Sequence, residues 1–155
     1  MIRLERVLVP IDFSKFSKHA LRYGCAFADE FHAELHLLHV LQDLIHVVPD
    51  VGTGLPAPDV YFREVHENAE KALAELPGDL WSGGKEVVRA LRTGTPFLEI
   101  VRYAKEEQID LIVLGTHGRS ALVHLLLGSV AEKVVRKAPC PVLTVRHPEH
   151  EFVPV

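Results

Sequence analysis

Three glycines and a serine have a spacing that could hold a phosphate group. Gly115 and Gly118 follow an apolar run, and Gly128-Ser129 comes nine residues later, where a helical pattern begins. Glycine turns let backbone N–H groups approach a ligand, and the first turn of a helix adds N–H groups and partial positive charge. The pattern favours an anion site, although the same glycines could serve only as turns. It lacks G-x-x-x-x-G-K-[ST], which excludes an ordinary P-loop.

Alternating strands and helices must position these residues. Short apolar runs predict five strands, at 7–11, 34–41, 86–91, 109–115 and 142–145. Apolar residues three and four apart predict four helices, which begin after Ser14, span 65–76, begin after Thr95 and begin at Ser129. Ser14, Thr95 and Ser129 are the predicted N-caps. Ser129 also has the capping-box spacing to Glu132. Helices between successive strands predict a doubly wound α/β fold with a parallel sheet, which binds ligands at the carboxyl ends of its strands.

The segment 42–59 separates the second strand from the second helix. It carries three prolines and two glycines, which are too many breakers for a regular element. Because loops of this length are usually functional or disordered, we expect a lid or a wall beside the ligand.

Composition and charge exclude several classes of protein. The chain has 155 residues, 48% hydrophobic and 25% charged, as expected of one soluble domain over 1–155. A net charge of −4 without a basic block argues against a nucleic-acid partner. The distant Cys25 and Cys140 indicate a reducing compartment. We see no secretion signal and no apolar run near the roughly 20 residues that cross a membrane, and so expect a cytoplasmic protein without a membrane partner.

Ten histidines raise the question of a metal site. His36 and His39 lie in a predicted strand, where their odd spacing puts them on opposite faces, so they cannot share a metal. No carboxylate or cysteine completes a set with His32, which favours packed or solvated histidines. His117 lies inside the glycine turn, where it could contact a phosphate or ribose or be a plain turn residue. No histidine is fixed beside either cysteine, which argues against a cysteine nucleophile.

The segment Gly115-x-x-Gly118, nine residues and Gly128-Ser129 resembles the nucleotide-binding signature of the universal stress protein family, in its ATP-binding subclass. Further matches span almost the whole chain: Val7-Leu8-Val9-Pro10-Ile11-Asp12, Leu37-Leu38-His39-Val40, Gly94-Thr95-Pro96 and Cys140-Pro141-Val142-Leu143. The resemblance implies a five-stranded parallel sheet in the order 3-2-1-4-5. It also implies a homodimer paired through the C-terminal strand, and ATP held between the first and fourth strands.

The resemblance implies a role for each site residue. Pro10 and Ile11 would line the base pocket, and Val40 would hydrogen-bond adenine through its backbone. Asp12 would contact the ribose, or a phosphate through Mg²⁺ or Mn²⁺, because a carboxylate beside a triphosphate needs a cation. Asp12 could also simply cap the first helix. Ribose and phosphates would be held by Gly115, Thr116, His117, Gly118, Arg119, Gly128, Ser129, Val130 and Ala131.

The implied function is that of an ATP-binding regulatory or signalling module in the stress response. ATP, ADP and AMP all remain possible ligands, and the protein partner is unidentified. Arg119 and Ser129 are present but no evident catalytic base is, so at most slow ATP hydrolysis is expected. Two alternatives stay open: a nucleotide-independent dimeric scaffold, and a slow ATPase.

Overall fold

Five strands and four α-helices form the described part of the chain, which in this computed structural model is residues 1–42, 58–82, 85–117 and 127–147. The strands are β1 (Arg6–Pro10), β2 (Glu34–Leu41), β3 (Val87–Thr93), β4 (Leu111–Gly115) and β5 (Val142–Val145). The helices are α1 (Lys15–Phe31), α2 (Pro58–Ala74), α3 (Pro96–Glu106) and α4 (Ser129–Lys137), with a short 3₁₀ turn at Gly78–Leu80. All strands pair in parallel in the order β3-β2-β1-β4-β5, which confirms the predicted doubly wound α/β fold.

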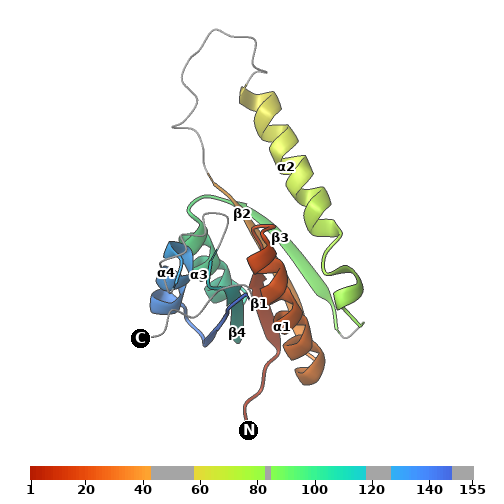
Figure 1. Ribbon diagram of the computed structural model, residues 1–155, viewed down its shortest axis with the longest axis vertical. Coiled ribbons are helices and arrows are strands. Elements are labelled where there is room, and N and C mark those ends of the chain that lie inside the picture. Colours follow the sequence, from red (N-terminus) through yellow and green to blue (C-terminus); the bar gives the residue numbers. More distant parts are fainter. Residues whose placement is uncertain (43–57, 83–84, 118–126, 148–155) are drawn as a thin grey trace.

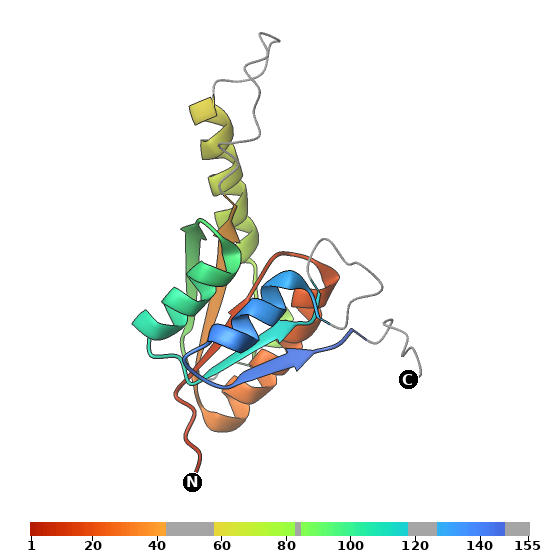
Figure 2. The same cartoon turned by 90° about the vertical axis from the view of Figure 1, so that its left-hand side faces the viewer.

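Helices cover both faces of the sheet, α1 and α2 on one side and α3 and α4 on the other (Figures 1 and 2). Alternate strand residues supply the two cores: Val7 and Val9 of β1 face α1, whereas Leu8 faces α3 and α4. All three side chains are fully buried. This double burial is the reason that β1 is an uninterrupted apolar run rather than an alternating one.

The N-cap predictions had different outcomes. Ser14 caps α1, since its side chain accepts the Ser17 N–H. Thr95 occupies the N-cap position of α3, but its side chain forms no capping hydrogen bond. The prediction for Ser129 is wrong: Gly128 is the N-cap of α4 and Ser129 is the first helical residue. The reason is a hydrogen bond of 2.6 Å from the Gly128 N–H to the Thr116 carbonyl, which holds Gly128 in an extended conformation just before the helix.

The Glu132 half of the predicted capping box is also absent. Its carboxylate lies 3.1 Å from the Arg136 Nε, one turn further along α4, and its N–H donates to the Gly128 carbonyl. The start of α4 therefore has no side-chain cap.

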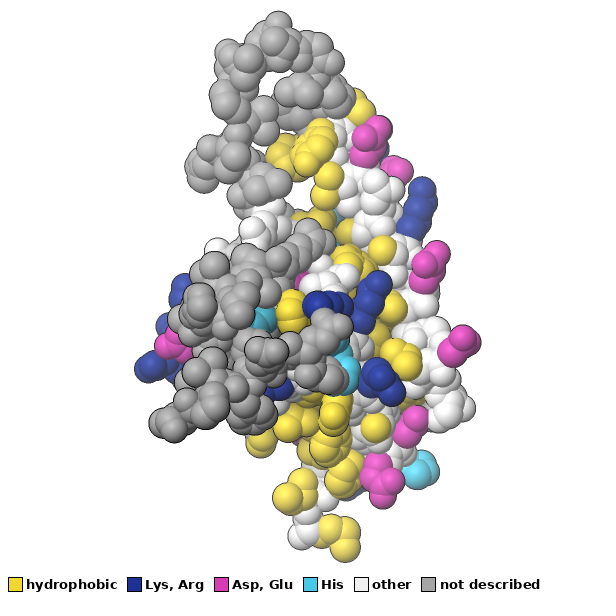
Figure 3. Space-filling view, in the orientation of Figure 1, with side chains coloured by type: hydrophobic (Ala, Val, Ile, Leu, Met, Phe, Trp, Pro, Cys, Tyr) yellow, Lys and Arg dark blue, Asp and Glu magenta, His cyan; other side chains and the backbone are white. Residues whose placement is uncertain are grey.

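The α2 region differs from its prediction at both ends. The helix begins at Pro58, inside the predicted loop 42–59, because proline is tolerated in a first turn. It ends at Ala74, so Leu76 lies beyond it. Charged side chains of both signs follow the outer side of α2 (Figure 3). The predicted lid lies mostly in 43–57, outside the described residues. Among the helices that the structure describes, none is long and apolar enough to cross a membrane.

Candidate functional site

The sheet brings most of the predicted site residues to one edge. Pro10 ends β1, Gly115 ends β4, and Val40 is the second-last residue of β2. The strand order reverses between β1 and β4, which are neighbours, and this is where doubly wound sheets bind ligands. Gly118 and Arg119 lie outside the described residues.

The backbone of Val40 lies beyond the end of β1. The last rung between the two strands is the Ile11 N–H donating to the Leu38 carbonyl at 2.8 Å. The next rung would join the Val40 N–H to the Ile11 carbonyl, but the His39 Nδ1 lies 2.6 Å from that oxygen instead. A carbonyl only accepts, so Nδ1 is the donor. No described residue pairs with the N–H or C=O of Val40 on this side, which leaves one donor and one acceptor directed past β1.

Asp12 is held in the turn between β1 and α1. Its Oδ1 accepts the Ser14 N–H at 2.9 Å, and its own N–H donates to the Ser17 Oγ at 3.3 Å. Asp12 is therefore not the cap of α1, a position that Ser14 occupies, but its bonds fix the turn that leads into the helix. Phe13, with a left-handed φ of 64°, completes that turn.

The same carboxylate fits a divalent cation that arrives with phosphates. Mg²⁺ in such sites takes one or two carboxylates and draws its other ligands from phosphate and water. The described residues hold no group of three or more His, Cys, Asp or Glu side chains placed around a metal. A cation beside Asp12 would therefore depend on phosphate and water for most of its ligands.

Gly115 and Gly128 lie where the backbone packs closely. A Cβ on Gly115 would lie 3.0 Å from the carbonyl oxygen of Phe16 in α1, and one on Gly128 would lie 3.0 Å from that of Thr116. Neither glycine has a positive φ. The two glycines thus join the start of α1, the end of β4 and the start of α4, which gives them a structural role independent of any ligand.

Thr116 and His117 are packed rather than exposed, at 1% and 6% of their accessible surface. The Thr116 N–H donates to the Val145 carbonyl, and its Oγ1 lies 3.0 Å from the His117 Nδ1. The His117 ring lies 5.9 Å from the ring of Phe16. The imidazole is therefore part of the packing between β4 and α1.

The first turn of α4 presents unpaired backbone donors. The first intrahelical bond runs from the Glu132 N–H to the Gly128 carbonyl. No residue in the described ranges accepts the N–H groups of Ser129, Val130 or Ala131. Ala131 is buried in the core, so it can offer only its backbone, whereas Ser129 is exposed and offers its hydroxyl as well. Such a helix start attracts anions.

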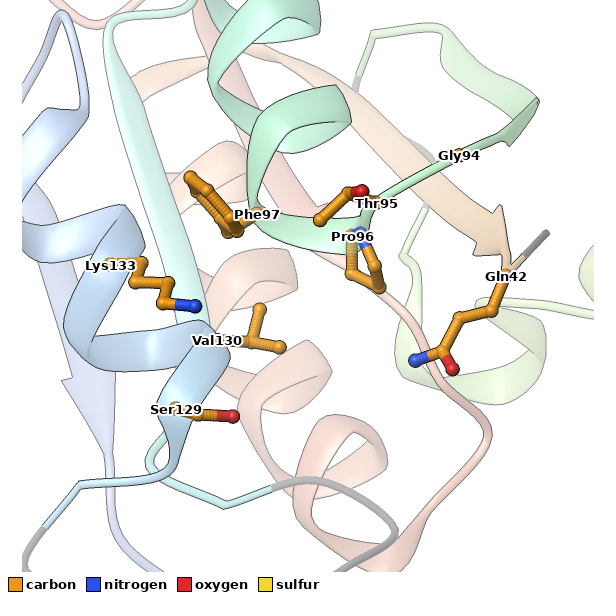
Figure 4. A pocket seen from close by; sticks show the side chains of 8 residues that line it. All are labelled: Gln42, Gly94, Thr95, Pro96, Phe97, Ser129, Val130 and Lys133. Atoms are coloured by element: carbon orange, nitrogen blue, oxygen red, sulfur yellow. The ribbon is translucent and has the colours of Figure 1, made fainter. Parts of the chain in front are cut away.

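A pocket of about 460 Å³ opens beside these donors, a volume typical of small-molecule sites (Figure 4). It is lined by Gln42, Gly94, Thr95, Pro96, Phe97, Ser129, Val130 and Lys133. Only Ser129 and Val130 were predicted site residues. Gln42 is the first residue of the predicted loop 42–59, which was expected to form a wall beside the ligand. No binding role was predicted for Lys133 or for the start of α3, although Gly94-Thr95-Pro96 is one of the motifs that carry the family resemblance.

The histidines of β2 and the two cysteines are not placed for metal binding or nucleophilic chemistry. His36 and His39 lie on opposite faces of the sheet, as predicted: His36 contacts Tyr103 of α3, and His39 contacts Phe13 before α1. Burial raises the pKa of the Cys25 thiol to about 12. Burial likewise raises the pKa of Cys140 to about 11, so both thiols are protonated at neutral pH.

Comparison with known proteins places this chain in one family. The sequence model of the "Universal stress protein family" matches residues 3–146. A universal stress protein of Methanocaldococcus jannaschii is 35% identical over 150 residues, which cover 95% of this chain and 85% of the relative. The solved structure of a second protein of that archaeon, MJ0577, is also similar, with a TM-score of 0.80 at 29% identity. The match covers 96% of this chain and 99% of the MJ0577 chain.

A solved universal stress protein in complex with cAMP is also similar. Its TM-score is 0.59 at 26% identity, and the match covers 93% of this chain and 98% of that one. The family match, the relatives and the sheet order agree with one another. This chain belongs to the universal stress protein family.

Proposed function

We propose that this chain binds an adenine nucleotide, ATP in the first place, and acts as a nucleotide-dependent regulatory module in the stress response. The observation that carries the proposal is the start of α4, where three unpaired N–H groups adjoin a pocket of about 460 Å³. Helix starts of this kind bind phosphate groups without further cationic side chains. The relative solved with cAMP, another adenine nucleotide, supports the choice of ligand class.

The backbone of Val40 supports adenine as the base. Adenine presents a ring-nitrogen acceptor and an amino donor on one edge. Val40 offers the complementary N–H and C=O, both directed past the end of β1. A single residue of extended backbone can therefore recognise the base, while Pro10 and Ile11 form the adjoining wall.

Asp12 and the start of α4 hold the sugar and the phosphates in this proposal. The carboxylate of Asp12 contacts a ribose hydroxyl or a bound cation, and the first-turn N–H groups and the Ser129 hydroxyl contact phosphate oxygens. Mg²⁺ or Mn²⁺ bound with the phosphates supplies the positive charge that lets Asp12 lie beside them. Gly118 and Arg119 belong to the same proposed site on the basis of the signature alone.

Nucleotide occupancy can act as a signal because it stabilises the state that binds it. A ligand present at 100 times its Kd adds about 2.7 kcal/mol to the free energy of unfolding. The proposed module is a homodimer paired through β5, and a protein partner would respond to the nucleotide-bound form.

The test is calorimetric titration of the nucleotide-free protein with Mg-ATP and with AMP, repeated on Gly128→Val and Ser129→Ala. Wild-type protein should bind with micromolar affinity. Valine at 128 should abolish binding, because its Cβ would meet the Thr116 carbonyl at 3.0 Å and displace the start of α4. Ser129→Ala is the matched control: it removes one hydroxyl, keeps all three N–H groups, and should retain most of the affinity.

Circular dichroism must show that each variant is folded. A folded wild-type protein that binds neither nucleotide would refute the proposal and favour the nucleotide-independent scaffold. Phosphate release from Mg-ATP, measured in the same samples and lost in Asp12→Ala, would instead establish the slow ATPase.

A further inference from the structure

The pocket contains a lysine to which the proposed nucleotide site gives no role. Lys133 lies one turn after Ser129 in α4 and lines the same pocket (Figure 4). Its Nζ lies 4.9 Å from the centroid of the Phe97 ring in α3. No acidic side chain in the described part of the chain forms an ion pair with Lys133. Its charge is held only by a weak cation–π contact.

The surroundings of Lys133 favour negative charge. The pocket is also lined by Thr95, Pro96 and Phe97, which form the start of α3, so two helix N-termini with their partial positive charge adjoin one cavity. The nearest buried acid, Glu99, is already paired with two arginines, Arg102 and Arg92. The pocket lining therefore combines one ammonium and two helix N-termini with no acidic side chain.

Lys133 is also placed to reach beyond the first phosphate. Helical side chains tilt toward the helix N-terminus, so the long Lys133 side chain can extend from its contact with Phe97 toward the first turn of α4. Four residues of helix rise about 6 Å, which separates the base of this side chain from the N–H groups of that turn. A phosphate bound at those N–H groups leaves Lys133 to contact the next phosphates of a chain.

We propose, on the basis of the nucleotide site proposed above, that Lys133 contacts the outer phosphates and makes the pocket selective for nucleotide di- and triphosphates over monophosphates. In the nucleotide-free protein the ammonium rests on Phe97. When a polyphosphate enters, the ammonium moves to it, because a charge-assisted hydrogen bond is stronger than an exposed cation–π contact.

The chain offers a matched control in Lys137. It lies one turn further along α4, and its Nζ is 5.9 Å from the centroid of the same Phe97 ring. It does not line the pocket. Removing its charge tests whether an effect at Lys133 arises only from the packing of α4 on Phe97 or from the general charge of the helix.

The experiment is calorimetric titration of wild-type protein, Lys133→Gln, Lys133→Arg and Lys137→Gln with Mg-ATP, Mg-ADP and AMP at fixed ionic strength. Lys133→Gln should weaken ATP and ADP binding by about five- to tenfold and leave AMP binding unchanged. Lys133→Arg should restore most of the ATP affinity, and Lys137→Gln should change none of the three.

Other outcomes would overturn the inference in distinguishable ways. If wild-type protein binds ATP but Lys133→Gln does not change its affinity, or weakens ATP and AMP equally, Lys133 does not contact the outer phosphates and the proposed nucleotide site still stands. If Lys137→Gln has the same effect as Lys133→Gln, the effect is one of helix charge or packing. A folded wild-type protein that binds no nucleotide would remove both proposals together.

Discussion

Replacing Gly24 with alanine tests the packing of α1 on the sheet. Gly24 is buried in the middle of α1, and an added Cβ would lie 2.2 Å from the Cγ2 of Val9 and 3.9 Å from the Cδ1 of Leu35. Carbon atoms in contact lie about 3.5–4.0 Å apart, so Val9 or the helix must move by more than 1 Å. Val9 is fully buried in β1 and, being β-branched, has little rotational freedom to relieve the contact.

Two opposing effects decide the sign of the change. Alanine in place of glycine inside a helix stabilises by about 1 kcal/mol. Overpacking a buried site costs about 1–3 kcal/mol, and the stiffness of Val9 argues for the upper end. We expect Gly24→Ala to lower the free energy of unfolding by about 2 kcal/mol, which for a chain of this length lowers Tm by about 4–8 °C.

Urea denaturation of a double-mutant cycle measures this contact. Val9→Ala alone should cost about 2 kcal/mol through lost burial and a cavity. The double variant should be no less stable than Val9→Ala, because the new Cβ of residue 24 occupies the space that the valine methyl groups leave. The two changes together then cost about 2 kcal/mol less than the sum of the single changes, which is the coupling energy. Ala26→Gly, on the exposed side of α1, calibrates the helix propensity and should cost about 1 kcal/mol. A Gly24→Ala protein as stable as the wild type would show that α1 can shift on β1 without cost, and would refute the reasoning.

Three further predictions concern pH, thiol reactivity and assembly. Burial lowers the pKa of His36 below its ordinary value of 6.5, so below pH 6.5 the unfolded chain binds a proton that the folded chain excludes. The free energy of unfolding should therefore fall on acidification by up to about 1.4 kcal/mol per pH unit, and urea titrations of His36→Gln should show a shallower fall; an equal fall would contradict this role. Cys25 and Cys140, whose pKa values are raised to about 12 and about 11, should react with iodoacetamide far more slowly at pH 8 in the native than in the unfolded protein; equal rates would contradict their burial. In β5 the carbonyls of Pro141 and Val145 accept hydrogen bonds from β4 and the residue that follows it, so the even-numbered Thr144 directs its N–H to the other, open side of the strand. Thr144→Pro removes that N–H. It should convert a dimer paired through β5 into a monomer by light scattering, and an unchanged mass would exclude that pairing.

The sequence predicted the elements well where burial alone decides the pattern. β1, β2 and β4 are buried on both faces, and their apolar runs mark them to within a few residues. The order of the strands could not be derived in this way, because periodicity says nothing about which strands are neighbours. It came from the family resemblance and is confirmed by the structure.

The errors at the site arise from contacts between distant segments. The sequence around Ser129 has a good local capping pattern. The N-cap is nevertheless Gly128, because the Gly128 N–H donates a hydrogen bond to the Thr116 carbonyl. Similarly, Lys133 and the start of α3 face one pocket only because α3 and α4 pack side by side on one face of the sheet. No local pattern contains either relation, so propensity and spacing could not predict them.

The packing of the glycines changes what the signature can prove. Gly115 and Gly128 are each opposed by a backbone carbonyl oxygen 3.0 Å from where a Cβ would lie, so the packing of the fold favours glycine at both positions whether or not a nucleotide binds. The two glycines can therefore be explained by the packing of α1, β4 and α4 alone. The evidence that separates a binder from a scaffold must therefore come from groups that the fold leaves unused. The backbone of Val40 and the first-turn N–H groups of α4 are such groups, because no described residue pairs with them and a ligand can take the place of the water that hydrates them.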